Sequence, residues 1–327
     1  MAMRSHIIWR FGALAALILC CAAWSGAQPP PRRVLKRESE RRVSFLNGSR
    51  FFMPSWQGRA LLGMEINKVD EPVIVGVDQD GRTERIGFSI PGAGLIGILG
   101  LAGAGDGTIA AVGVAYDQDG QPASFLARIP PDRSRKLLVQ LGLYVADAVT
   151  IAADGTMWTV GVVGGDKDVT EYNVLKRFDA SGMVLATKAV RAQGTGRRGR
   201  DATETSLLRS SKDRVGWLTN ANEYIEFGLD GNELGRYPPP PGPPPTVFTT
   251  TFALSENNTV IVGTPGDTGV RVSLLNRKTR SWERVELPGA ELPASANLGF
   301  DGDKVVVVDN GNGFDATIAR YAFSASE

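Results

Sequence analysis

The stretch IAADGTMWTVGVVGGDKDVTEYNVLKRFDASGMVLATKAV, residues 151–190, decides the fold that this sequence predicts. Two tight-turn signals, Asp154-Gly155-Thr156 and Asp179-Ala180-Ser181-Gly182, separate apolar segments that each have the length of a strand. Apolar runs punctuated by Asp-Gly and Asp-x-x-Gly turns are typical of antiparallel hairpins joined into a meander. We therefore predict three strands, over Met157–Val163, Val174–Phe178 and Met183–Val190.

The same unit recurs along the chain. Its first turn returns at intervals of roughly 44 to 59 residues, at Gln57-Gly58, Asp106-Gly107, Asp154-Gly155, Asp213-Arg214, Asn257-Asn258 and Asp301-Gly302. Repeats of about 40 to 50 residues with several strands each are the mark of β-propeller blades. Six units fit, so we predict an all-β, six-bladed propeller of four-stranded antiparallel blades.

The last unit predicts how the ring closes. Three strands, Asn297–Phe300, Val305–Val308 and Thr317–Phe323, take it to the end of the chain, which leaves no room for a fourth. A spare strand, Arg42–Leu46, precedes the first unit. We predict that this N-terminal strand completes the last blade, because closing the ring removes both exposed sheet edges.

The N-terminus is predicted to be a targeting segment. Arg4 and Arg10 flank the start of an apolar run, Phe11–Ala23, which is short for a membrane-spanning helix, and Ser25-Gly26-Ala27 would suit cleavage before Gln28. The predicted organisation is a signal peptide over residues 1–27, a disordered tether over 28–40 and the propeller domain over 41–327. We expect an exported protein, periplasmic or extracellular. The alternative is a membrane anchor by an uncleaved segment, because several arginines and lysines follow closely and positive charge there resists translocation.

Both cysteines and the single histidine lie in this N-terminal segment, as Cys20, Cys21 and His6. A mature chain without them has no disulfide, no thiolate or imidazole metal ligand and no His-based catalytic triad. The formal net charge of +1 predicts no nucleic-acid partner. We identify no catalytic residues.

The pattern resembles the six-bladed propellers of the NHL-repeat and streptogramin-lyase-like kind. The resemblance rests on Asp154-Gly155-Thr156-Met157-Trp158, an Asp-Gly-Thr turn that enters a strand carrying tryptophan. It implies the fold and not an activity, because propellers support enzymes and binding platforms alike. The lack of a mature histidine argues against a lyase of that family. Trp158 and the equivalent Trp217 are predicted to pack between blades.

The longer connections are predicted to gather on one face of the disc. The first and third connections of each blade are tight, whereas the middle and crossing connections are irregular, including a basic loop after Val190 and a proline run after Tyr237. Loops on a rigid scaffold commonly carry function. We therefore predict a monomeric binding or scaffold module for a protein or small-molecule ligand, with a membrane partner only if the N-terminal segment is uncleaved. The candidate contact residues are Asp166, Asp168, Tyr172, Arg197, Arg198, Arg200, Asn220, Asn222 and Tyr237.

An alternative from another class is a metal-dependent hydrolase or lactonase resembling the gluconolactonase and regucalcin-like propellers. That resemblance implies a divalent cation such as Ca²⁺ held by carboxylate and amide oxygens, which are the ligands that calcium prefers. The candidate ligands are Glu65, Asn67, Asp166, Asn220 and Asp309. The other interpretation of these loop residues is turn chemistry, because Asp and Asn favour turns in any protein.

Overall fold

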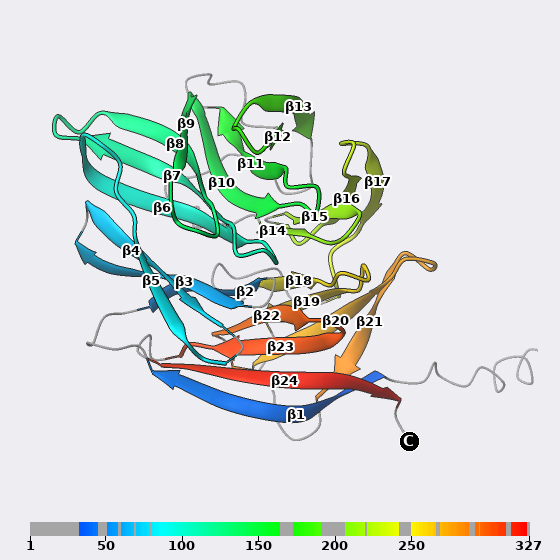
Figure 1. Ribbon diagram of the computed structural model, residues 1–327. Coiled ribbons are helices and arrows are strands. Elements are labelled where there is room, and N and C mark those ends of the chain that lie inside the picture. The colour runs from blue at the N-terminus through cyan, green and yellow to red at the C-terminus, as the bar shows by residue number, and fades with distance from the viewer. Residues whose placement is uncertain are drawn as a thin grey trace, which may run out of the picture.

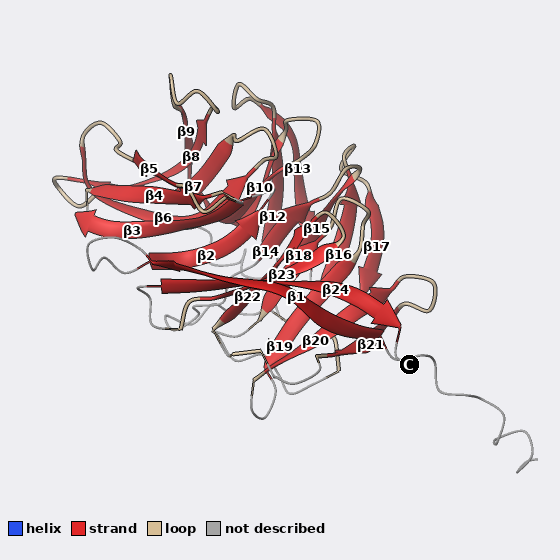
Figure 2. Cartoon of the chain, turned by 60° about the horizontal axis from the view of Figure 1, so that its bottom comes forward, coloured by secondary structure: helices blue, strands red, loops and turns tan. Residues whose placement is uncertain are grey.

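The computed structural model describes residues 33–44, 51–57, 60–68, 70–78, 80–163, 173–190, 207–219, 221–241, 250–265, 269–287, 292–293, 295–311 and 315–325. The predicted signal peptide over residues 1–27 lies outside these ranges. Every regular element within them is a β-strand, and Figures 1 and 2 show the strands fanned around a ring. The described residues include no helix that is long and apolar enough to span a membrane.

The strands form the six predicted four-stranded blades, each ordered from the inner strand outward. Blades one to three are β2 (Phe51–Gln57), β3 (Ala60–Lys68), β4 (Glu71–Val77) and β5 (Thr83–Gly87); β6 (Ala93–Gly103), β7 (Ile109–Asp117), β8 (Pro122–Ile129) and β9 (Leu137–Gly142); and β10 (Tyr144–Ile151), β11 (Met157–Val163), β12 (Asn173–Phe178) and β13 (Val184–Val190). Blades four to six are β14 (Leu207–Ser210), β15 (Arg214–Leu218), β16 (Tyr224–Gly228) and β17 (Glu233–Tyr237); β18 (Thr251–Leu254), β19 (Val260–Pro265), β20 (Val270–Asn276) and β21 (Ser281–Glu286); and β22 (Ala296–Asp301), β23 (Lys304–Asp309), β24 (Asp315–Ala325) and β1 (Arg33–Ser44).

The N-terminal strand closes the ring, as predicted. Strand β1 pairs antiparallel with β24 from end to end, and Figure 1 shows the blue first strand beside the red last one. Arg33 and Val34 also pair in parallel with the end of β21, which joins blades five and six into one eight-stranded sheet. The inner strands contact one another all the way round, including β2 with β22 across the closure.

The start of this strand differs from the prediction. It begins at Arg33 rather than Arg42, so residues 33–40 are part of blade six and the disordered tether predicted for them is wrong. An outermost strand exposes most of its side chains, and here only Leu35 and Val43 are buried. Its charged sequence therefore has the composition of a solvated linker. The chain nevertheless forms a strand here, because β24 at the other end of the sequence supplies its backbone hydrogen bonds.

The core is divided among six apolar clusters, and each lies between two adjacent blades of the described ring. Strand β7 shows why the strands are apolar on both sides: Ile109 and Ala111 face blade one, whereas Ala110 and Val112 face blade three. Successive strand residues point to opposite faces, and both faces of a blade are covered. The cluster between blades three and four holds Trp158 and Trp217, which confirms their predicted packing role.

The first turns are tight because their sequences suit hairpins. Asp106 and Asp154 each accept a hydrogen bond from the backbone N–H two residues on, at 2.8 and 3.0 Å. Gly107 and Gly155 have φ of 88° and 79°, in the left-handed region where glycine is favoured. These short turns leave the ends of the inner strands ringed around the axis.

Candidate functional site

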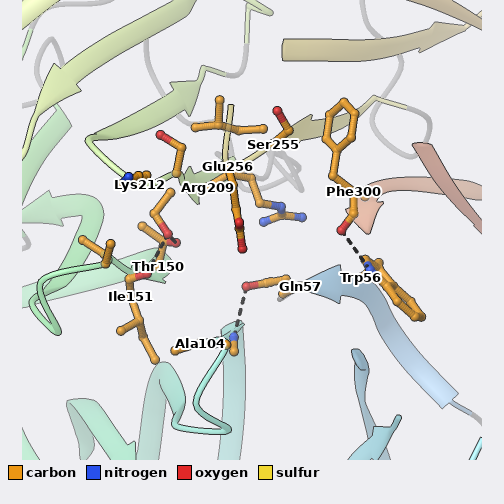
Figure 3. Close-up of a pocket in the computed structure, with 18 of the residues that line it drawn as sticks. Trp56, Gln57, Ala104, Thr150, Ile151, Arg209, Lys212, Ser255, Glu256 and Phe300 are labelled. Carbon is orange, nitrogen blue, oxygen red and sulfur yellow. Dashed lines mark hydrogen bonds between the residues drawn. The ribbon is translucent and has the colours of Figure 1, made fainter. Parts of the chain in front are cut away.

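A cavity of about 880 Å³ opens at the centre of the ring, on the side of the tight first turns. Its wall takes residues from the end of the inner strand, or from the turn that follows it, in all six blades (Figure 3). One residue from each blade illustrates this ring: Gln57, Ala104, Ile151, Arg209, Glu256 and Phe300. The repeated first turns of the sequence are thus the rim of the cavity. This is the face that the sequence predicted to be plain, and it is opposite the face predicted to bind.

Polar side chains cross the ring at this cavity. The Arg209 guanidinium on β14 donates from Nη2 to Ser55 Oγ on β2, at 2.9 Å, and from Nη1 to the Leu208 carbonyl oxygen, at 2.8 Å. Gln57 donates to the Leu101 carbonyl oxygen at 2.9 Å and accepts from the Gly103 N–H at 3.1 Å. Figure 3 shows the Arg209 and Gln57 side chains turned toward the middle of the cavity. Blades one, two and four are therefore held together by polar groups on its wall.

Arg209 carries a charge that no carboxylate neutralises within the described part of the chain. Among the described residues it forms no ion pair and no hydrogen bond with Asp or Glu, and its covered Nε has no acceptor. Desolvation by the surrounding protein lowers the pKa of the guanidinium to about 10. The group is still protonated at neutral pH, so the cavity wall holds a positive charge with free hydrogen-bonding capacity, since a guanidinium has five N–H donors.

The carboxylates on the wall are mostly occupied. Asp301 accepts from Arg320 Nε at 2.9 Å, and Asp106 accepts from the backbone and hydroxyl of Thr108. Glu256 is exposed, as is the cation Lys212. The partly buried positive charge of Arg209 is thus matched only by an exposed carboxylate in solvent, where interactions between charges are weak.

Most of the contact residues predicted from sequence lie outside the described ranges, namely Asp166, Asp168, Tyr172, Arg197, Arg198, Arg200 and Asn220. Asn222 and Tyr237 are described, and both are buried, with 4% and 7% of their surface exposed. The Asn222 N–H donates to the Thr219 carbonyl oxygen at 2.8 Å inside a turn. Tyr237 stacks on Tyr224 and donates to Glu226. Such burial does not fit the predicted role of these two side chains in contacting a partner.

The side chains of two candidate metal ligands are described, and each binds different partners. Glu65 is 1% exposed and pairs with Arg85 at 2.7 Å, whereas Asp309 accepts from the Ser295 hydroxyl and the Gly311 N–H. The side chain of Asn67 lies outside the description, as do Asp166 and Asn220. Within the described ranges, no three Asp, Glu, His or Cys side chains converge as a metal site would require.

Sequence reasoning missed Arg209, although a signal for it exists. The described inner strands carry only three charged residues, Asp147, Arg209 and Asp301, because these strands pack against neighbours on both sides. Arg209 is the one cation among them. A charge within an inner strand marks the axis of the ring, and its isolation from carboxylates depends on packing between blades that are distant in sequence.

The chain is similar in fold to several solved structures. A gluconolactonase from Xanthomonas campestris is 14% identical, with a TM-score of 0.48, over 90% of this chain and 95% of that one. The β-propeller domain of Cps50 (Swd1) from Myceliophteria thermophila is 11% identical, with a TM-score of 0.50, over 89% and 100%. A puromycin-hydrolysing peptidase from Mycobacterium tuberculosis is 14% identical, with a TM-score of 0.47, over 88% and 56%.

The likeness to the β-propeller domain of Cps50 (Swd1) bears on the fold and not on an activity. No protein-family model matches the chain, and no curated protein matches it either. The fold class is therefore that of a β-propeller, and the narrower resemblance to NHL-repeat propellers stays a prediction.

Proposed function

We propose that this propeller is a binding module for a small anionic ligand, which it takes into the central cavity on the tight-turn face. The observation that carries the proposal is the Arg209 guanidinium on the cavity wall, with no carboxylate partner among the described residues. Arginine binds carboxylate and phosphate groups through paired, charge-assisted hydrogen bonds. A bound anion would supply the partner that the described residues do not.

The cavity suits a small molecule. Its volume of about 880 Å³ falls in the range of roughly 300 to 1,000 Å³ that is common for ligand pockets. Six blades contribute to the wall, and the rigid ring fixes the position of each contact before the ligand arrives. Pre-organisation of this kind reduces the entropy lost on binding.

Export also remains a proposal, supported by the N-terminal pattern of charge, apolar run and small residues. Cell fractionation of the full chain and of a form lacking residues 2–27 tests it. The full chain should leave the cytoplasm and the shortened form should not. The metal-dependent hydrolase is supported by its sequence resemblance alone, and thermal unfolding with EDTA and then excess calcium tests that alternative.

Thermal unfolding with inorganic phosphate at constant ionic strength tests the proposed ligand class. A ligand at 100 times its dissociation constant stabilises a protein by about 2.7 kcal/mol, which should raise the unfolding midpoint of a domain this size by several degrees. Arg209→Met should abolish the rise. The matched control is Arg82→Met, which removes an exposed arginine that does not line the cavity.

A rise in the wild type and in Arg82→Met, but not in Arg209→Met, supports the proposal. An equal rise in all three proteins would locate phosphate binding elsewhere on the surface. No rise in the wild type would mean that the cavity does not take this anion.

A further inference from the structure

Two arginines occupy equivalent positions in adjacent blades and have opposite surroundings. Arg128 on β8 lies across from Ala110 on β7, and Arg177 on β12 lies across from Trp158 on β11. Ala110 and Trp158 are each the second residue of their strand, just after equivalent Asp-Gly turns. The two blades therefore present a natural comparison of the same side chain in the same position.

The charge of Arg177 is neutralised within its own blade. Its Nη2 donates to Asp154 Oδ2 at 3.0 Å, and its guanidinium lies over the Trp158 ring at 5.7 Å from the centroid. Burial alone would raise the pKa of Asp154, but hydrogen bonds from Thr156 and the charge of Arg177 outweigh it and lower that pKa. The turn carboxylate and the aromatic ring of its blade thus hold Arg177, although its Nε is covered and has no acceptor among the described residues, as in Arg128.

Arg128 has none of these partners. Alanines replace the aromatic ring at its side, with Ala110 beside Ala102 in the next strand. The turn carboxylate Asp106 accepts hydrogen bonds from Thr108, as Asp154 does from Thr156, but among the described residues it makes no contact with Arg128 that would match the Asp154–Arg177 pair. Arg128 makes no hydrogen bond or ion pair with any residue in the described part of the chain, its covered Nε included, and it lines the same cavity as Arg209.

Two arginines from blades two and four, with no carboxylate partner in the described ranges, therefore line one cavity. We propose that Arg128 is a second anion-binding residue and that the ligand carries two negative charges, as a phosphate monoester or a dicarboxylate does. This inference rests on the proposed function and narrows its ligand class. The two charges of such a ligand match the two arginines, and each guanidinium can bind an oxygen pair. A monoanion leaves one of the arginines unpaired.

Matched pairs of anions test the inference. Methyl phosphate is compared with dimethyl phosphate, and succinate with butyrate, at pH 8, where methyl phosphate and succinate are doubly charged. Dissociation constants are measured by calorimetric titration and by the shift of the unfolding midpoint, at constant ionic strength. The first pair tests one doubly charged group and the second tests two separate groups, so the preferred pair identifies the source of the charge.

The wild type should bind the dianion of at least one pair about tenfold more tightly than its monoanion, because one additional charge-assisted hydrogen bond increases affinity by about that factor. Arg128→Met should lose this preference and still bind the monoanion through Arg209. Arg128→Lys keeps the charge and should restore part of the preference, which a purely structural role of Arg128 would not produce. Arg82→Met should behave as the wild type.

The outcomes separate the two proposals. If anions bind and the wild type shows no preference, or if the preference survives in Arg128→Met, the role of Arg128 is refuted while the anion site at Arg209 stands. The absence of a preference in the wild type refutes the role of Arg128 without any variant, and Arg128→Lys provides the test of a positive result if Arg128→Met unfolds. If none of the four anions binds, the proposed function fails and this inference fails with it.

Discussion

Charged side chains are paired at the interface between blades four and five, whereas two arginines at the central cavity have no carboxylate partner among the described residues. At the interface, Glu226 is 1% exposed and accepts hydrogen bonds from two arginines, Arg214 and Arg277, and from the hydroxyls of Tyr224 and Tyr237. The arginines come from different blades, so the carboxylate joins them. Every charge in this cluster has an opposite partner at hydrogen-bonding distance.

At the cavity, Arg209 and Arg128 have no such partner among the described residues. Removing water from an unpaired charge costs free energy that a protein avoids where stability alone is at stake. The contrast indicates that the interface is built to hold the ring together and that the cavity is built to receive an anion. The predictions below test each side of this contrast.

The largest effect is expected at the interface. Glu226→Ala leaves Arg214 and Arg277 close together without their shared carboxylate, and breaking a buried ion pair of this kind costs on the order of 3 to 5 kcal/mol. Thermal unfolding should show a midpoint lower by roughly ten degrees. The control is Glu233→Ala, which removes the partly exposed carboxylate bound to Arg236 and should cost less than about 1 kcal/mol. Equal midpoints for the two variants would remove the structural side of the contrast.

A smaller loss is expected at Glu65, whose exposed fraction of 1% equals that of Glu226. Glu65→Ala breaks the ion pair with Arg85, whose side chain is 33% exposed and can be hydrated once its partner is gone. We expect a loss of about 1 to 3 kcal/mol in the free energy of unfolding. Chemical denaturation with and without calcium measures it. The loss should be the same in both conditions, and a difference between them would support Glu65 as a metal ligand instead.

Replacing the cavity arginine should cost little stability. Arg209→Met removes two hydrogen bonds and also removes an uncompensated charge, so the free energy of unfolding should stay within about 1 kcal/mol of the wild type. Its unfolding midpoint without added anions provides the measurement. A fall as large as that of Glu226→Ala would identify Arg209 as part of the structural framework rather than a binding residue.

The pKa of Arg209 predicts how anion binding depends on pH. Anion binding requires the protonated guanidinium of Arg209. Because the pKa of this group is about 10 in the free protein, the guanidinium loses its proton and its charge as the pH rises through that value. The affinity for sulfate, whose charge is constant in this range, should be steady from pH 7 to 9 and fall above 10. Calorimetric titration measures it, and Lys212→Met should keep the same fall. A decline that is complete by pH 8.5 would point to another group.

The smallest effect is expected at the rim. Glu256 is an exposed carboxylate on the cavity wall, and its charge opposes an incoming anion. Glu256→Gln should increase the affinity for phosphate about twofold to fivefold at low salt, because interactions of exposed charges are worth less than about 1 kcal/mol. The gain should vanish at high ionic strength. A weaker affinity in this variant would mean that Glu256 contacts the ligand directly.

The fold could be predicted from sequence because its signals are local. Asp-Gly turns and apolar strands repeat with each blade, and strand β11 coincides with the predicted Met157–Val163. The start of β1 could not be predicted, since its residues are charged and its pairing partner stands almost 300 positions further along the chain. An exposed edge strand has no apolar pattern of its own to mark it.

The cavity was harder to predict for a related reason. The segment Leu207–Ser210 shows a charge within an inner strand but not that Arg209 lacks a carboxylate partner among the described residues, because that lack depends on blades distant in sequence. The same holds for Arg128 and Arg177, which differ in their cross-strand neighbour and in the use of the turn carboxylate. The irregular loops were therefore predicted to form the binding face, whereas the short turns around the axis carry no sequence signal for a cavity.

Anomalous diffraction from crystals soaked in selenate tests the central claim most directly, because selenium marks where a dianion binds. The account predicts a selenium peak inside the central cavity, with selenate oxygens at hydrogen-bonding distance from the Arg209 guanidinium, and no such peak in Arg209→Met. Selenate bound only on the outer surface, with the cavity free of it in the wild type, would contradict the account.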